Sequence, residues 1–423
     1  MGVDIKEQLQ RRKEAAVKLR NTSSEKKNRA LVTAADFIDR SHDKILAANK
    51  QDIKDLANNS DEKTKSSAFQ DRLVLDAKRL KEISAGLRAV AALPDPVNEE
   101  VESRTIENGL RLKRVRSPIG VIFMIFESRP NVAIEAFSMA FKAGNVILLR
   151  GGKESQQTTK ILYSLLRQAL SSAGVSEDSF WGIDDMDRGL VLELLQQKKF
   201  IDLVVPRGGE GLIAFVEDNS LIPIIKNDRG LCHIYVHSDA DLEMAADLIE
   251  NSKTQRPGVC NSLETVLVHE SIKPEFLPLL HARLLPYKVE WHVCRDSLKV
   301  LKGKPYVHVA KSASWDTEYL DLKMNCHVVT SLHEALSHIE KHGSKHSEGI
   351  VTRSEKVARE FQSTVDAAVC YWNASTRFTD GFQFGLGGEL GISTQKLHVR
   401  GPVGIKDLTS IRWIVDGEGQ VRK

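Results

Sequence analysis

Hydrophobic positions recur at helical spacing over the first part of the chain. From residue 4 to residue 93 apolar side chains return every three or four positions, which is typical of amphipathic helices. Thr22 followed by Glu25 fits a capping box at the start of one such helix. The region ends at Pro94, which cannot continue a helix. The pattern predicts a helical start whose apolar faces need another layer to pack on.

Residues 99–116 show a different pattern, in which apolar and charged side chains alternate. The alternation is centred on Asn108-Gly109, a dipeptide that favours a two-residue hairpin turn. We expect a β-hairpin outside the main sheet. Such a hairpin is either a subunit contact or a plain surface hairpin, and the pattern alone leaves both open.

From Ser117 onward short apolar runs alternate with helical periods, which predicts parallel sheets covered by helices on both faces. The same order returns after His233, so we expect a second α/β unit. The predicted strands cover 120–126, 146–149, 201–205, 234–236, 265–268 and 367–371. The predicted helices cover 130–143, 158–173, 210–219, 241–252 and 273–284, and nothing is assigned to 291–322.

Composition narrows the class of protein. Of 423 residues, 41% are hydrophobic and 28% charged, with a formal net charge of +3. We therefore expect a globular protein that binds no nucleic acid. The longest apolar run, 119–126, is too short for a membrane span. The five cysteines are widely spaced and odd in number, so we expect no disulfide framework, no metal site and a cytoplasmic location.

Cys260 is the first candidate for chemistry. It lies in a loop-like stretch with Arg256, Pro257 and Gly258, just before the strand predicted over 265–268. Basic Lys253 and Arg256 would favour the thiolate, which is the reactive form of cysteine. A structural cysteine is the alternative, and the loop setting makes the two equally plausible.

Two glycine-rich turns follow predicted strands. Arg150-Gly151-Gly152-Lys153 follows one strand, and Gly208-Gly209 follows another and opens a helix. Ligands of parallel sheets bind at the carboxyl ends of strands, and free N–H groups at a helix start bind anions. Together the turns favour a dinucleotide site, although each alone fits an ordinary turn.

Polar side chains of two further loops suit an acidic substrate. Arg129 and Asn131 follow the strand predicted over 120–126, and either can donate to a developing oxyanion. Arg377 lies in the polar stretch 373–385, and its guanidinium is a good carboxylate or phosphate ligand. The alternatives are a polar turn before a helix and a long structural loop.

Several segments together resemble the γ-glutamyl phosphate reductases, a family of the aldehyde dehydrogenase superfamily. The resemblance runs through nearly the whole chain and includes Phe126-Glu-Ser-Arg-Pro-Asn-Val132, Arg150-Gly-Gly-Lys-Glu154, Lys253-Thr-Gln-Arg-Pro257 through Cys260-Asn261, and Asn373-Ala-Ser-Thr-Arg-Phe-Thr-Asp380. It implies an α/β fold with a Rossmann-like cofactor domain (1–98 and 117–232), an α/β catalytic domain (233–404) and an oligomerisation hairpin with a C-terminal strand (99–116 and 405–423).

The resemblance also implies a reaction. NADPH would reduce L-glutamyl 5-phosphate to L-glutamate 5-semialdehyde and phosphate, the second step of proline biosynthesis, through a thioester on Cys260. Asn131 and the Cys260 backbone N–H are then candidates for binding the oxyanion. Arg129, Arg256 and Arg377 are candidates for the substrate phosphate and α-carboxylate, without an assignment of which holds which. Arg150, with help from Lys153, suits the 2′-phosphate of NADPH.

One departure separates this chain from hydrolytic aldehyde dehydrogenases, which have a water-activating glutamate upstream of the cysteine. The comparable stretch here is Asn227-Asp-Arg-Gly-Leu231. Its lack of glutamate argues against an NAD-dependent oxidation to the acid, with Asp228 as the remaining doubt. A catalytically silent scaffold is the third alternative. We also expect a homo-oligomer and a separate glutamate 5-kinase that makes transient contact.

Overall fold

The structure is a computed structural model of the 423-residue chain. It describes residues 4–57, 67–127, 129–226 and 229–422. The chain forms two compact units. The first unit comprises Met1–Lys226, Gly385–Gly391 and Val403–Lys423, and the second comprises Asn227–Phe384 and Ile392–Pro402.

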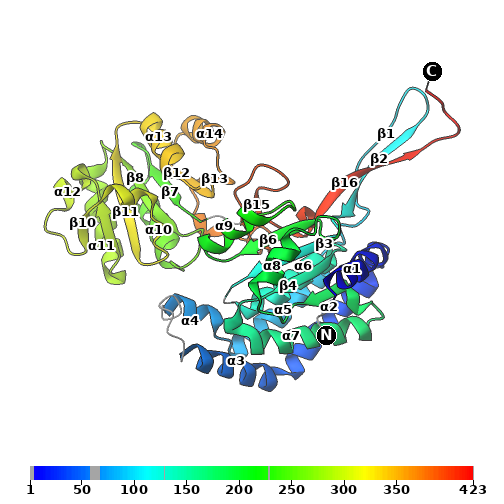
Figure 1. Ribbon diagram of the computed structural model, residues 1–423. Coiled ribbons are helices and arrows are strands. Elements are labelled where there is room, and N and C mark those ends of the chain that lie inside the picture. Colours follow the sequence, from blue (N-terminus) through cyan, green and yellow to red (C-terminus); the bar gives the residue numbers. More distant parts are fainter. Residues whose placement is uncertain (1–3, 58–66, 128, 227–228, 423) are drawn as a thin grey trace. The chain divides into compact units, whose positions relative to one another are not determined.

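Helices dominate the start of the first unit, as the hydrophobic period predicts (Figure 1). The N-cap of α2 is Ser23, whose extended backbone lets its Oγ accept from Lys26 N at 3.4 Å. The predicted capping residue, Thr22, is wrong, because its hydroxyl bonds back to Lys18 O of the preceding helix at 3.2 Å. The helices are α1 (Ile5–Arg20), α2 (Ser24–Arg40), α3 (His42–Ala57), α4 (Ser67–Leu73) and α5 (Ala77–Ala92).

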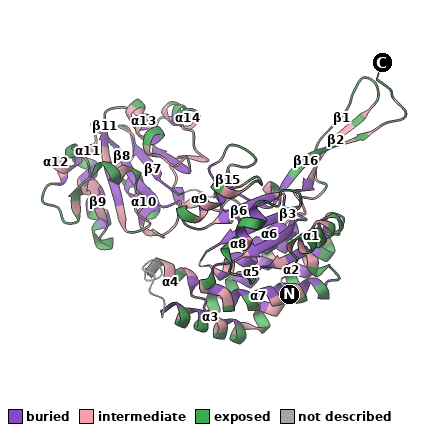
Figure 2. Cartoon of the chain, in the orientation of Figure 1, coloured by how far each residue is buried: buried purple, intermediate pink, exposed green. Residues whose placement is uncertain are grey.

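A four-stranded parallel sheet of order β5-β4-β3-β6 forms the core of the first unit. All residues of the central strand β3 (Val121–Phe126) are buried, as expected for a strand covered on both faces (Figure 2). The other elements are β4 (Val146–Arg150), β5 (Phe180–Gly182), β6 (Leu203–Arg207), α6 (Pro130–Lys142), α7 (Gln156–Ser172), α8 (Arg188–Leu195) and α9 (Glu210–Asn219).

The predicted hairpin is present as β1 (Glu100–Thr105) and β2 (Arg111–Pro118), which pair antiparallel. Gly109 takes φ +83° in the turn, a conformation that glycine adopts without strain. A third strand, β16 (Thr409–Asp416), pairs with β2 to give a three-stranded sheet (Figure 1). The predicted association of the C-terminal strand with the hairpin is therefore confirmed as a strand pairing, whereas a role in oligomerisation stays a prediction.

The second unit is built on a seven-stranded sheet of order β10-β9-β11-β8-β7-β12-β13, in which all neighbouring strands are parallel. The strands are β7 (Cys232–Val236), β8 (Leu263–His269), β9 (Glu290–Val293), β10 (Val307–Val309), β11 (Lys323–Val329), β12 (Ser347–Val351) and β13 (Val369–Trp372). Its helices are α10 (Leu242–Thr254), α11 (Lys273–Leu284), α12 (Arg295–Leu301), α13 (Leu332–His342) and α14 (Glu355–Thr364). The short pair β14 (Ile392–Ser393) and β15 (Gly401–Pro402) completes it.

Successive residues of the second sheet point into different cores. Ile234 and Val236 pack with α10 and α11 on one face, and Tyr235 between them packs with α13 and α14 on the other. Side chains of β7 alternate between the two faces of the sheet, so this one strand contributes to the hydrophobic core on each face.

The α/β fold class predicted from the sequence is confirmed. The domain boundaries stay a prediction: the compact units change at Lys226 rather than at 232, and Gly385–Gly391 belongs to the first unit. In the part of the chain that the structure describes, no helix has the length and apolar character needed to cross a bilayer.

Candidate active site

Cys260 lies in the loop between α10 and β8, at the amino end of β8 and beside the amino end of β7. The helix before the loop has a polar cap at Asp241, whose side chain accepts from Met244 N at 3.1 Å. Its last turn leads into Pro257 and Gly258, which cannot extend it favourably. Cys260 itself is half-buried and free of a disulfide. The structure therefore agrees with the loop predicted for the candidate nucleophile.

The segment 375–379 holds the Cys260 loop in place. The side-chain amide of Asn261 donates to Thr379 O at 2.8 Å, and Thr376 Oγ1 donates to Asn261 O at 2.7 Å. Ser252 and Ser375 share a hydrogen bond of 2.9 Å between their buried hydroxyls. Because Asn261 follows Cys260 directly, these bonds fix the backbone of the cysteine.

Arg377 also contacts this loop, whereas its predicted role in binding the substrate stays a prediction. Its Nη1 donates to Asn261 Oδ1, and its Nε donates to Gln255 Oε1 at 2.9 Å. Burial, together with the charge of Arg256, lowers the pKa of Arg377, and Cys260 acts in the opposite direction. The exposed Arg256, Arg377 and Cys260 are thus close enough to interact electrostatically. The structure brings three of the predicted site residues together.

Lys253 behaves differently from the sequence expectation, which had it favour the Cys260 thiolate. Its ammonium is buried and lies 3.4 Å from Glu264 Oε2. Burial raises the pKa of Glu264, and Lys253 opposes that rise. Glu264 Oε1 also accepts from Leu320 N at 3.3 Å. The pair links the last turn of α10 to the start of β8, so it holds the two ends of the Cys260 loop together.

Cys232, the first residue of β7, and Gly230 before that strand both contact the Cys260 backbone. Cys232 is buried, and its Sγ donates to Cys260 O at 3.2 Å. Burial raises the pKa of the Cys232 thiol well above its usual value, so it remains protonated and can donate. A side chain at Gly230 would overlap the carbonyl group of Cys260. From the sequence we expected Cys232 to be inert packing and assigned no role to Gly230, because the contact of each with Cys260 depends on tertiary packing.

In the first unit, the three predicted loops lie at one edge of the parallel sheet. Glu127, Gly151 and Gly208 directly follow the parallel strands β3, β4 and β6, in which Ile125 pairs with Arg150 and Phe126 with Arg207. Strand order reverses at β3, because β4 lies on one side of it and β6 on the other. Ligands of open α/β sheets bind at such a position. The glycine turns therefore lie at one edge of the sheet, and their binding of a dinucleotide stays a prediction.

Some charged groups at this edge of the sheet already form hydrogen bonds within the protein. Glu127 Oε2 accepts from Gly209 N at 2.9 Å, so a carboxylate already takes one N–H at the start of α9. Arg150 Nη2 donates to Met186 O at 3.0 Å, and burial lowers the pKa of this guanidinium. Arg150 Nε is buried and has no hydrogen-bond partner among the described residues. Lys153 is exposed at the next turn.

Arg129 and Asn131 also belong to the first unit. Arg129 is the N-cap residue of α6, and Asn131 lies in the first turn of that helix. Asn131 Nδ2 donates to Glu135 Oε1 at 2.9 Å, which is an i to i+4 contact along the helix. Cys260 belongs to the second unit, so the predicted cooperation of Asn131 with Cys260 stays a prediction.

A second reactive-looking cysteine was not foreseen. Cys294 is the N-cap residue of α12, in the segment that the sequence left unassigned. Burial raises the pKa of its thiol, but hydrogen bonds from His327, Ser297 and the Val328 amide outweigh burial and lower it to about 6. Among the residues that the structure describes, no group of three or more His, Cys, Asp or Glu side chains is placed to hold a metal ion. Asn227 and Asp228 lie outside the described residues.

Comparison with known proteins gives the family. A model of the aldehyde dehydrogenase family matches residues 2–296. A γ-glutamyl phosphate reductase of Moorella thermoacetica is 45% identical over 423 residues, covering 100% of both chains. The crystal structure of γ-glutamyl phosphate reductase from Thermotoga maritima superposes with a TM-score of 0.94 at 43% identity, covering 100% of both chains. An engineered glycolyl-CoA reductase with bound NADP⁺ shares the fold alone, with a TM-score of 0.70 at 15% identity and coverage of 97% of this chain and 96% of that one.

The fold and the cysteine loop define an oxidoreductase of the aldehyde dehydrogenase type, as the sequence predicted. Within that superfamily the chain belongs to the γ-glutamyl phosphate reductase family.

Proposed function

We propose that the chain reduces L-glutamyl 5-phosphate to L-glutamate 5-semialdehyde with NADPH and releases phosphate, the second step of proline biosynthesis. The observation that carries the proposal is the half-buried Cys260 in a loop held by Asn261, with two guanidinium groups within electrostatic range. Full-length relatives named for this activity support the choice of substrate. The free cysteines fit a reducing cytoplasm.

The first half of the reaction is acyl transfer to sulfur. The Cys260 thiolate attacks the carbonyl carbon of the acyl phosphate, and the C–O bond to phosphate breaks. The negative charge on the carbonyl oxygen needs N–H donors, for which the Cys260 backbone N–H and Asn131 are the candidates. Phosphate leaves with the electron pair of the broken bond, and a γ-glutamyl thioester remains on Cys260.

The second half requires a reductant, and the first unit fits a nicotinamide cofactor. Gly151, Gly152, Gly208 and Gly209 lie in the two turns at the carboxyl edge of the sheet, where ligands of such sheets bind. When bound, the cofactor supplies the hydride that reduces the thioester. Cys260 then leaves as the thiolate while the aldehyde is released.

Arg150 supports the choice of NADPH over NADH. Its Nε–H is buried without a hydrogen-bond partner in the described residues, and a buried donor of this kind favours a negatively charged ligand. Lys153 adds a second, exposed cation three residues along the chain. Both would interact with the 2′-phosphate that distinguishes NADPH.

The substrate carries a phosphate and an α-carboxylate, which require cationic partners. Arg256 and Arg377 lie in the second unit near Cys260, and Arg129 lies in the first unit. Each guanidinium can bind a carboxylate or phosphate with two parallel hydrogen bonds. The assignment of each arginine to one anion remains open.

The reverse reaction tests the proposal. Wild-type protein and Cys260→Ser are incubated with glutamate 5-semialdehyde, with NADP⁺ or NAD⁺, and with or without phosphate. We expect phosphate-dependent formation of NADPH that is lost in Cys260→Ser and slower with NAD⁺. Formation of glutamate without phosphate would show a hydrolytic aldehyde dehydrogenase, and no turnover under any condition would favour a silent scaffold.

We also propose that the chain forms a homo-oligomer through the sheet β1-β2-β16. Ile411, Trp413 and Val415 alternate along β16 and are each about half exposed, so they present one apolar face. Sedimentation of wild type and Trp413→Ser should show a smaller species for the variant. The same method, applied to a mixture with glutamate 5-kinase, tests the expected transient complex, which independent sedimentation would contradict.

A further inference from the structure

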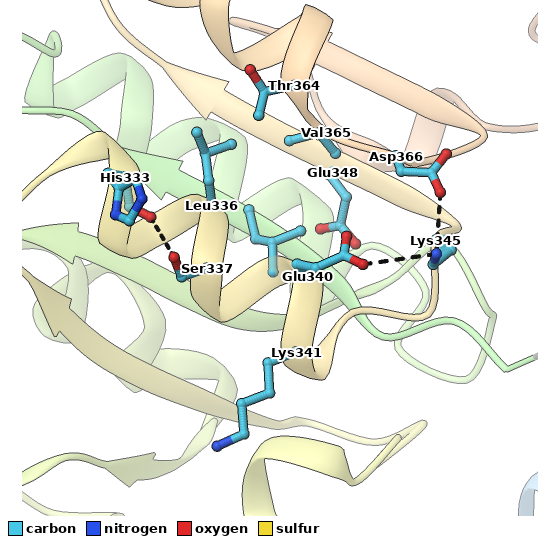
Figure 3. A pocket seen from close by; sticks show the side chains of 11 residues that line it. His333, Leu336, Ser337, Glu340, Lys341, Lys345, Glu348, Thr364, Val365 and Asp366 are labelled. Carbon is cyan, nitrogen blue, oxygen red and sulfur yellow. Dashed lines mark hydrogen bonds and ion pairs between the residues drawn. The ribbon is translucent and has the colours of Figure 1, made fainter.

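A cavity of about 500 Å³ lies beside α13 in the second unit (Figure 3). Leu336 and Ile339 of α13 and Val365 after α14 form its apolar walls. Three carboxylates, Glu340, Glu348 and Asp366, lie around it. The rest of the lining is polar or charged and includes Lys341 and Lys345, and the volume is that of a small-molecule site.

Glu348 is the lining residue with an unsatisfied hydrogen-bond acceptor. Its Oε2 accepts from the backbone N of His233 at 2.9 Å and lies 3.0 Å from His233 Nδ1. Its Oε1 is buried and has no hydrogen-bond partner in the described part of the chain. Desolvation makes a buried acceptor without a donor unfavourable, so native proteins rarely keep one without a role.

The other carboxylates already have cationic partners. Asp366 lies 3.1 Å from Lys345 Nζ, 2.9 Å from Lys396 Nζ and 2.7 Å from Arg400 Nη1. Glu340 shares Lys345 with Asp366, at 3.9 Å. Lys341 is directed away from this group (Figure 3). Glu348 pairs with His233 through Oε2 alone, and that contact leaves Oε1 as the acceptor without a donor among the described residues.

We propose that the cavity binds a small aliphatic ammonium ion, which donates to Glu348 Oε1 and packs its carbon chain on Leu336, Ile339 and Val365. An ammonium group has three donors and satisfies an acceptor that no described side chain reaches. The carbon chain of such a ligand covers the apolar walls and removes them from water, which favours binding. The ligand is either a free amine or the ammonium end of an α-amino acid.

The site borders the cysteine loop through one strand. Glu348 holds His233, the residue after Cys232, and Cys232 donates to Cys260 O. The binding proposal itself does not depend on the proposed reductase activity, because it concerns residues that the reaction does not use.

Isothermal titration of the full chain with three related probes tests the ligand class. Isopentylammonium and 3-methylbutan-1-ol have the same carbon chain but differ in charge, and L-leucine adds a carboxylate to isopentylammonium. We expect saturable binding of one ammonium probe per chain and at least tenfold weaker binding of the alcohol. Tighter binding of L-leucine identifies an amino acid as the ligand, and weaker binding identifies a free amine. Equal binding of the alcohol, or no saturable binding of either ammonium probe, would overturn the proposal.

Two substitutions test the location. Glu348→Gln removes the negative charge and should weaken ammonium binding at least tenfold, but it also disturbs the contact with His233. Thr364→Trp avoids that problem, because Thr364 is an exposed residue that lines the cavity and a large ring there fills it. Ser363→Trp is the matched control, since Ser363 is exposed on the same helix end and does not line the cavity. We expect binding to be lost in Thr364→Trp and unchanged in Ser363→Trp. Equal binding by the two tryptophan variants would place the ligand elsewhere.

Discussion

The Sγ of Cys232 lies 3.2 Å from the backbone oxygen of Cys260 and donates a hydrogen bond to it. The two cysteines are 28 residues apart, and one supports the backbone of the other. The fully buried Cys232 thus holds the backbone of the half-buried Cys260. The inner thiol stays protonated because burial raises its pKa, and His346 Nδ1 lies 3.7 Å from it.

Replacing Cys232 by alanine should slow the enzyme without removing its nucleophile. Loss of one hydrogen bond worth about 1 kcal/mol to a positioned backbone corresponds to about a fivefold lower kcat. Steady-state assay of Cys232→Ala checks this, with Cys370→Ala as the control, because Cys370 bonds to Val365 O outside the loop. An unchanged kcat in Cys232→Ala would show that the bond does not position Cys260.

Gly230→Ala should lower kcat about a hundredfold. The added methyl would overlap the Cys260 carbonyl group, and a shift of about 1 Å in a reacting group can cost this much. Gly258→Ala is the matched control in the same loop, since its methyl would meet Leu320 O at an ordinary 3.7 Å. Circular dichroism confirms that both variants fold. The interpretation fails if the two alanine variants have equal rates.

Glu264→Gln should destabilise the protein by about 3 kcal/mol, because Lys253 would remain buried without its counter-charge. Urea unfolding measures the change. The double variant Lys253→Met with Glu264→Leu should regain most of the loss, since it removes both charges and keeps the volume. Equal stability of Glu264→Gln and wild type would mean that the ion pair does not stabilise the base of the loop.

His338 should make the second unit less stable in mild acid. Burial, with the nearby His233 and His327 rings, lowers the pKa of His338 to about 2. The unfolded chain protonates a histidine near pH 6.5, so between that pH and 2 the unfolded state binds more protons and stability falls as pH falls. The contribution is about 1.4 kcal/mol per pH unit for one group.

His338→Phe removes this titration and should reduce the acid sensitivity of the free energy of unfolding, measured between pH 6 and pH 4. His333→Phe is the control, because His333 is exposed on the same helix. A slope for His338→Phe that equals the slope for His333→Phe would contradict the effect of burial.

The fold could be predicted largely because hydrophobic residues recur at regular spacing along most of its helices and strands. The alternation around Asn108-Gly109 gave the hairpin, and the apolar runs gave the central strands of both sheets. The segment around β9 and β10 was missed because strands of four and three residues, with histidines among them, show no period.

The sequence could indicate which individual loops carry candidate site residues, but not how those loops contact one another. Cys260, Arg377 and the glycine turns stand in loops with recognisable chemistry. The contact of Arg377 with Asn261 joins residues 116 positions apart, and that of Glu127 with Gly209 joins residues 82 apart. Such contacts depend on tertiary packing, and no local pattern signals them. Lys253 shows the same limit, since its charge was evident but its buried partner was not.

Trapping the thioester tests the central claim most directly. Wild-type enzyme is mixed with glutamate 5-semialdehyde and NADP⁺ in the absence of phosphate, quenched in acid and mapped by peptide mass spectrometry. We expect a burst of one NADPH per site and a glutamyl group on the peptide with Cys260, discharged when phosphate is added. Cys294→Ser should behave like wild type and Cys260→Ser should show neither signal. A burst without a Cys260 adduct, or an adduct on Cys294 alone, would contradict the account.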